Sequence, residues 1–227
     1  MMSVLLVLPT ACDKDFDLSF VIDGSGSIEQ AGKGNFKKVK DFVKRIIGGF
    51  NIGEDKTHVG AVIYSSSQYV KKVFGLDSYF NLASLERAID KIPYPSGGTF
   101  TGKAISLATR EIYTSSKDRS DIPNVCIVIT DGKATDSIEE ASRTLRSKGT
   151  TIIAIGVGQN FDEAELIKMA GSRSNVYTAD FSDLGTVIED IKQSACQGWS
   201  YSQRGLWALR NMSRNDGIFI FPVIKYE

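Results

Sequence analysis

Histidine is almost absent from this chain of 227 residues, which contains only His58. A hydrolase of the Ser-His-Asp type needs an imidazole beside its nucleophile as general base. His58 begins an apolar segment, residues 58–64, that has the pattern of a strand, so we interpret it as structural. The composition therefore argues against this class of enzyme.

Cysteine is also scarce, with three residues in the chain. Cys126 lies in the apolar run 124–129 and is expected to be a small buried hydrophobe, which makes it a poor nucleophile. Cys12 and Cys196 lie just outside the two ends of the region with regular hydrophobic periodicity. If the chain is secreted, a Cys12–Cys196 disulfide would close the domain at its base, although sequence alone does not prove the pairing.

An excess of charge of either sign is missing, because 27 basic residues balance 27 acidic ones. Proteins that bind nucleic acids usually carry a basic excess or a basic patch. The basic clusters here, such as Lys37-Lys38 and Lys71-Lys72, are short and are typical of solvated faces. We therefore expect no nucleic-acid partner.

Long apolar runs are missing too. Residues 2–11 are apolar but too few to span a bilayer. They resemble the hydrophobic part of a signal peptide without the usual basic segment before it. The alternatives are an N-terminal strand, an incomplete gene model or a lipoprotein signal ending at Cys12. We expect residues 1–11 to be a truncated signal segment, with no direct membrane span in the chain.

Within the remaining sequence, strand-like and helix-like patterns alternate. The length favours one domain, which we place at residues 12–197. The alternation predicts an α/β fold: an open, mostly parallel, doubly wound sheet with one antiparallel edge strand and helices on both faces. The predicted strands are 17–22, 58–64, 69–76, 125–130, 151–157 and 175–179, and the predicted helices are 36–47, 82–92, 102–113, 137–148, 162–170 and 184–195.

Residues 198–227 break this alternation. Only the apolar segment 218–224 could form a strand, and it has no evident partner. We expect a mostly irregular C-terminal tail, or a non-native end of the gene model. Asn211 begins an Asn-Met-Ser sequon and is a candidate for N-glycosylation, although such triplets often occur by chance.

Oxygen-bearing side chains follow the ends of two predicted strands. The segment 23–27 (Asp-Gly-Ser-Gly-Ser) follows one buried strand, and 130–132 (Thr-Asp-Gly) follows another. A third segment, 97–102, precedes a helix. Ligands of open α/β sheets bind at the carboxyl ends of the strands, and hard cations prefer oxygen ligands. The glycines allow the tight turns that let neighbouring side chains converge.

A dinucleotide-binding enzyme is a rival interpretation of the same loop. Gly24 and Gly26 match the first two glycines of the Gly-x-Gly-x-x-Gly fingerprint, but Glu29 occupies the third position. The acidic residue expected about twenty positions later should end a strand, whereas Asp41 lies within a predicted helix. The fingerprint is therefore not met.

Taken together, these segments resemble the von Willebrand factor type A (VWA) domain and its metal-ion-dependent adhesion site. The resemblance covers about residues 15–195. The sequence around the motifs looks most like that of matrilins, non-fibrillar collagens and coadhesin-type matrix proteins. The family motif, Asp-x-Ser-x-Ser followed by a distant Thr and a distant Asp, is matched by Asp23, Ser25, Ser27, Thr99 and Asp131.

The resemblance implies an extracellular, secreted binding module and not an enzyme. The serines and the threonine would contact Mg²⁺ (or Mn²⁺ or Ca²⁺), and the aspartates would act directly or through water. A carboxylate of a partner would complete the metal's shell. The partner would be a matrix protein such as collagen, or a cell-surface receptor. In integrins the last helix, here 184–195, tunes affinity.

Three points stay open at the level of the family. Thr101 competes with Thr99 for the metal, and we expect Thr101 to cap the helix at 102–113, as Asp136 would cap the helix at 137–148. Specificity would come from the loops at 29–35, 94–101 and 135–137. The alternative function is a structural matrix module that assembles through surfaces other than the metal site.

Overall fold

The computed structural model describes residues 14–114, 119 and 121–195. Their strands form one sheet of six in the order β3-β2-β1-β4-β5-β6. All neighbours are parallel except β2 and β3, which are antiparallel. This confirms the predicted sheet. The bounds are β1 (Asp17–Asp23), β2 (His58–Tyr64), β3 (Val70–Phe74), β4 (Asn124–Thr130), β5 (Thr151–Val157) and β6 (Val176–Ala179).

The central strand β1 is buried along its whole length. Leu18, Phe20 and Ile22 belong to the core on one face of the sheet, and Val21 belongs to the core on the other. Successive side chains of a strand point to opposite faces, so a strand covered on both sides must be apolar nearly throughout. This is why its sequence shows a continuous apolar run.

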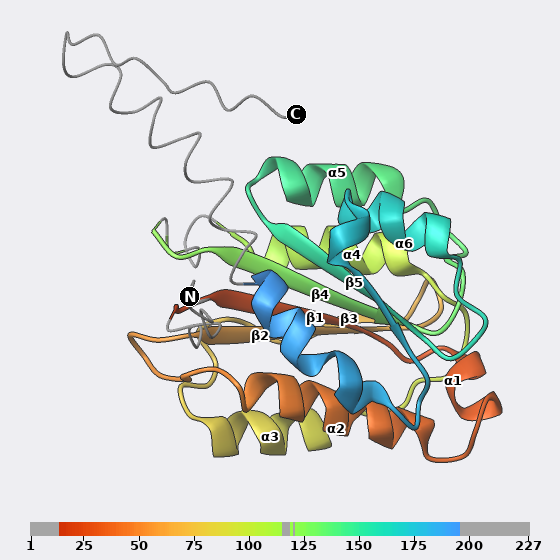
Figure 1. The fold of residues 1–227 in the computed structure, drawn as a ribbon, viewed down its shortest axis with the longest axis horizontal. Coiled ribbons are helices and arrows are strands. Elements are labelled where there is room, and N and C mark those ends of the chain that lie inside the picture. Colours follow the sequence, from red (N-terminus) through yellow and green to blue (C-terminus); the bar gives the residue numbers. More distant parts are fainter. Residues whose placement is uncertain (1–13, 115–118, 120, 196–227) are drawn as a thin grey trace, which may run out of the picture.

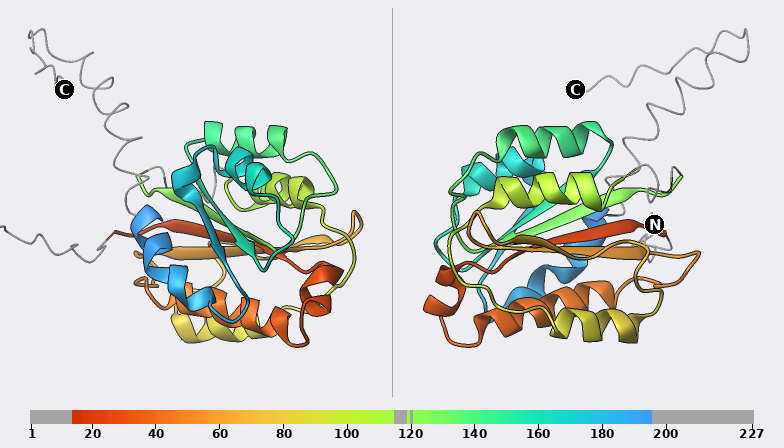
Figure 2. Two further views of the ribbon diagram at one scale, coloured as in Figure 1. Left: turned by 45° about the vertical axis from the view of Figure 1, so that its right-hand side comes forward. Right: turned by 180° about the vertical axis from the view of Figure 1, so that it is seen from behind.

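Helices cover both faces of the sheet (Figure 1). One face carries α2 (Asn35–Ile47), α3 (Leu82–Asp90) and the helical residues 188–195. The other carries α4 (Thr101–Glu111), α5 (Glu139–Ser147) and α6 (Glu163–Ala170), as the views in Figure 2 also show. In α2, apolar residues at spacings of three and four are buried: Phe36, Val39, Phe42, Val43, Ile46 and Ile47.

Three local features differ from the sequence prediction. A short helix, α1 (Gly26–Gln30), begins inside the predicted loop 23–27. The last helical segment begins with a 3-10 turn, η2 (Leu184–Val187), before residues 188–195. A further 3-10 turn, η1 (Arg173–Asn175), precedes β6. Helices and strands with strong hydrophobic periodicity could be predicted from the sequence, whereas short helical turns without such periodicity could not.

The two helix caps were assigned wrongly. Thr101 lies inside α4 as its first residue, and its hydroxyl donates to the buried hydroxyl of Tyr64 at 3.2 Å. The carboxylate of Asp136 accepts from the backbone N–H groups of Gly102 and Lys103, at 2.9 and 2.8 Å. Asp136 therefore caps α4, not α5. The loop before α5 approaches so closely that a Cβ on Gly102 would lie 2.1 Å from the backbone oxygen of Ser137.

Several sequence predictions concern residues beyond the described ranges. Cys12, Cys196 and Asn211 all lie outside the described residues, as do the predicted signal segment and tail. Cys126 is buried as predicted, and burial raises the pKa of its thiol to about 12. Within the described ranges, the helices lack the length and apolar character needed to cross a bilayer.

Candidate metal centre

The predicted site lies where the direction of winding reverses. From β1 the chain builds β2 and β3 on one side of the sheet, and then β4, β5 and β6 on the other. The carboxyl ends of β1 and β4 are therefore adjacent, and the loops that follow them diverge. Such a switch point is the usual ligand site of an open parallel sheet. Asp23 ends β1, and Asp131 directly follows β4.

Asp23 is fully buried, and two groups of the chain hold its carboxylate in place. Its Oδ1 accepts from the backbone N–H of Ser25 at 2.7 Å, and its Oδ2 accepts from the hydroxyl of Thr130 at 2.7 Å. Burial outweighs these hydrogen bonds and raises the pKa of Asp23 to about 6. The nearby charge of Asp131 raises it further.

Asp131 draws the two serines of the loop together. Its Oδ1 accepts from the hydroxyls of Ser27 at 2.8 Å and Ser25 at 3.3 Å. The two hydroxyl oxygens are themselves 3.0 Å apart. Four of the five predicted residues thus form one group that joins the end of β1 to the end of β4.

Thr99, the fifth predicted residue, is tied to this group through the backbone. Its carbonyl oxygen accepts from the backbone N–H of Thr135 at 2.8 Å and from its hydroxyl at 3.1 Å. Two residues earlier, the carbonyl of Gly97 accepts from the N–H of Gly26 at 2.9 Å. Thr99 is nearly buried, with 8% of its surface exposed. Its loop therefore contacts the loops after both β1 and β4.

The donor set fits a hard divalent cation. Asp131 Oδ2 is buried and has no hydrogen-bond partner, and such an orphan acceptor costs free energy unless something occupies it. Within the described residues, neither Asp23 nor Asp131 forms an ion pair with a basic side chain. Burial raises the pKa of both carboxyl groups. A cation would supply the missing positive charge.

The chemistry of this set is mostly that of hydroxyl groups. Among the described residues no three His, Cys, Asp or Glu side chains converge as a metal site. Here two carboxylates are combined with the hydroxyls of Ser25, Ser27 and Thr99. Such a set suits an oxygen-preferring ion, and its two carboxylates would match the charge of a divalent cation.

Sequence reasoning missed two residues that support the site. The hydroxyl of Thr130 donates to Asp23 at 2.7 Å, and its oxygen accepts from the N–H of Gly132 at 3.3 Å, so this hydroxyl links the ends of β1 and β4. The hydroxyl of Tyr94 donates to the backbone carbonyl of Ser25 in residues 24–27, which follow β1 and are called the serine loop below. Thr130 lies in a segment named for its oxygen-bearing side chains, and Tyr94 lies in a predicted specificity loop, but neither was given this role. Contacts to a second residue or to backbone leave no signature in sequence.

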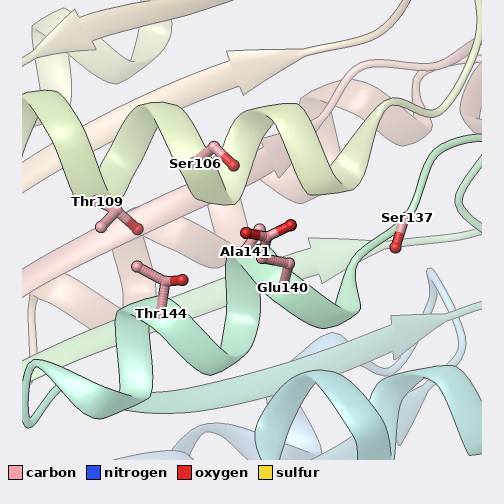
Figure 3. A pocket seen from close by; sticks show the side chains of 6 residues that line it. All are labelled: Ser106, Thr109, Ser137, Glu140, Ala141 and Thr144. Atoms are coloured by element: carbon pink, nitrogen blue, oxygen red, sulfur yellow. The ribbon is translucent and has the colours of Figure 1, made fainter.

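A separate groove between α4 and α5 is not part of this centre. It has a volume of about 280 Å³, and none of the five predicted residues lines it. Figure 3 shows small hydroxyl side chains and one carboxylate facing each other across it. The lining residues are Ser106, Thr109, Ser137, Glu140, Ala141 and Thr144.

Comparison with known proteins gives one consistent family. The family model described as the von Willebrand factor type A domain matches residues 17–193. The human collagen alpha-5(VI) chain is 35% identical over 185 residues, which is 81% of this chain and 7% of the collagen. Human matrilin-1 is 35% identical over 181 residues, 78% of this chain and 35% of matrilin-1. The chain thus spans well under half the length of these relatives.

Two solved structures share the fold. Proximal thread matrix protein 1 from the mussel byssus, with a zinc-occupied MIDAS motif, is 35% identical with a TM-score of 0.76. The match covers 82% of this chain and 46% of that one. Manganese-loaded TRAP protein from Plasmodium vivax has a TM-score of 0.64 at 20% identity, over 79% of this chain and 74% of that one. The latter likeness concerns the fold alone.

Proposed function

The chain belongs to the von Willebrand factor type A domain family, and from that premise we propose that it is a secreted, non-catalytic binding module. It binds a divalent cation at Asp23, Ser25, Ser27, Thr99 and Asp131, with Mg²⁺ as the first candidate and Mn²⁺ or Ca²⁺ as alternatives. The cation supplies a Lewis-acidic position for a carboxylate of a partner protein. The relatives named as collagens and matrilins favour a partner in the extracellular matrix.

The observation that carries the proposal is the pair of buried carboxylates that form no ion pair with a basic side chain among the residues that the structure describes. Asp131 Oδ2 is an unpaired acceptor, and the other oxygen of the same carboxylate accepts from the hydroxyls of Ser25 and Ser27. The protein's own residues preorganise this group: Thr130 and the N–H of Ser25 hold Asp23, and Thr135 holds the Thr99 loop. Little reorganisation is then needed when the cation enters.

The test is the double substitution Ser25→Ala with Asp131→Ala. We expect Mg²⁺ binding, measured by isothermal titration calorimetry, to be lost. Capture of partners from an extracellular matrix extract should fall to the level seen with excess chelator. A matched control is Ser147→Ala with Asp55→Ala, which changes the same residue types at exposed positions. The control should bind as the wild type does.

The alternative function, a matrix module that assembles through other surfaces, makes the opposite prediction. Partner capture would then survive both the double substitution and the chelator. If the protein binds Mg²⁺ but captures no partner in a metal-dependent way, the proposed cation binding stands and the proposed role of the cation in partner binding fails. Turnover of an ester or a nucleotide by the purified protein would refute the non-catalytic assignment.

A further inference from the structure

Tyr94 contacts the serine loop through its phenol group. The hydroxyl donates to the carbonyl of Ser25 at 2.9 Å and is 3.3 Å from the carbonyl of Gly26. Both carbonyls belong to the stretch of backbone between Asp23 and Ser27 in the sequence. This backbone also carries the side chains of Ser25 and Ser27, which contact Asp131. A shift of this backbone would move both serine hydroxyls together.

The residues after Tyr94 hold the same loop at two more points. A Cβ on Gly24 would lie 2.6 Å from Cδ of Pro95, so the proline ring packs directly on that glycine. The carbonyl of Gly97 accepts from the N–H of Gly26 at 2.9 Å. The segment then continues into Thr99. It therefore carries one predicted ligand and grips the loop that carries two others.

The ring of Tyr94 makes a further contact, with a core residue. It packs on Phe36 of α2, with ring centroids 5.2 Å apart and planes tilted by 45°. Phe36 is itself 4% exposed and part of the main core. The phenol oxygen is thus anchored to the body of the domain, and the serine loop is anchored to the phenol oxygen.

We propose that Tyr94 is a positioning residue for the metal site. Its hydroxyl holds the serine loop in the one arrangement in which Ser25 and Ser27 face Asp131 and the Thr99 loop together. This inference rests on the proposed function for its metal-binding consequence. The residue itself touches no metal: it acts through the backbone of Ser25 and Gly26.

The experiment is Tyr94→Phe, which removes only the hydroxyl and keeps the ring on Phe36. Without that bond the loop samples other arrangements, and the apparent affinity falls with the fraction of binding-competent protein. Loss of one hydrogen bond of ordinary strength predicts Mg²⁺ binding about fivefold weaker by calorimetry. In the metal-free protein, the amide hydrogen of Gly26 should exchange with solvent several-fold faster. Its hydrogen-bond acceptor, the carbonyl of Gly97, belongs to the same segment as Tyr94, so a looser serine loop should open this bond more often.

Tyr177→Phe is the matched control. The hydroxyl of Tyr177 also lies near two backbone carbonyls, those of Ser174 and Asp190, each at 3.3 Å, and it contacts the hydroxyl of Ser194. These contacts are at β6, away from the proposed metal site. We expect wild-type Mg²⁺ affinity and unchanged exchange at Gly26 in this variant. A purely structural role for Tyr94 would lower stability in urea and leave metal affinity as it was.

The outcomes separate the two proposals. Weaker Mg²⁺ binding in Tyr94→Phe alone supports the positioning role. Equal affinity in wild type and Tyr94→Phe, or an equal loss in both variants, overturns it. If the wild type binds no divalent cation, the proposed function fails. In that case, unchanged amide exchange at Gly26 in Tyr94→Phe would also overturn the proposal that the Tyr94 hydroxyl holds the serine loop. Faster exchange would support that proposal.

Discussion

At the scale of single residues, the burial of Asp23 places a carboxyl group where its charge opposes folding. Asp23 is fully buried, and its pKa of about 6 lies about two units above the ordinary value. At about 1.4 kcal/mol per unit, its ionised form costs the metal-free protein up to about 3 kcal/mol near neutral pH. Folding alone would not select a charge at this position.

Asp23→Asn should therefore stabilise the metal-free protein by about 1–3 kcal/mol at pH 7.5. Asparagine keeps the shape and can accept from Ser25 N–H while donating to Thr130. Urea unfolding with chelator measures the gain. The same variant should lose any stabilisation by Mg²⁺. A variant less stable than wild type in chelator would show that the carboxylate contributes to folding by itself.

Thr130 and Tyr94 mark the limit of what single residues reveal in sequence. The five oxygen ligands were predicted because the family motif specifies their types and order. The two supporting residues donate to a carboxylate and to backbone carbonyls that the fold brings near. Such contacts depend on three-dimensional placement, for which a lone Thr or Tyr gives no signal.

At the scale of elements, Glu29 of the short helix α1 shows how a residue of one helix stabilises the start of another, α2. Its two carboxylate oxygens accept from the N–H groups of Gly34 and Phe36, at 2.7 and 2.8 Å. Gly34, the N-cap of α2, has no side chain with which to cap it. These backbone hydrogen bonds hold the pKa of Glu29 below its ordinary value.

Glu29→Gln should destabilise the protein by about 1 kcal/mol at pH 7, since an amide offers only one acceptor oxygen. Because the folded pKa is lowered, the ionised carboxylate contributes stability above its ordinary pKa of about 4.3. That contribution is lost as the pH falls through the lower folded value. Urea unfolding at pH 7 and pH 3 should show a gap between variant and wild type that closes at the lower pH. A gap independent of pH would contradict this role.

The errors in element prediction have the same origin. Asp136 has the right residue type just before a predicted helix, yet it caps α4 across space. Thr101 has the right type for a cap, yet it enters α4 and bonds to Tyr64. Strands β1, β4 and β5 were predictable because burial on both faces demands long apolar runs. Caps are chosen by proximity, which periodicity does not encode.

At the scale of the whole molecule, the central strand carries a buried carboxylate at each end. Asp17 at its amino end is fully buried and pairs with Arg119, whose Nε and Nη2 lie 2.9 and 2.6 Å from Asp17 Oδ1. Asp23 at the other end forms no ion pair with a basic side chain among the described residues. Arg119 balances the charge of Asp17, and under the proposed function a cation would balance that of Asp23.

The two ends should behave independently. A strand of seven residues separates them by about 20 Å, beyond the range over which substitutions usually couple. Arg119→Met should cost about 3–5 kcal/mol, because it leaves Asp17 as an uncompensated buried charge. Urea unfolding of wild type and variant, each with Mg²⁺ and with chelator, should give the same Mg²⁺ increment in both. An increment that shrinks in Arg119→Met would mean that the sheet transmits the state of its amino end to the metal site, and that partner binding could be tuned from the base of the domain.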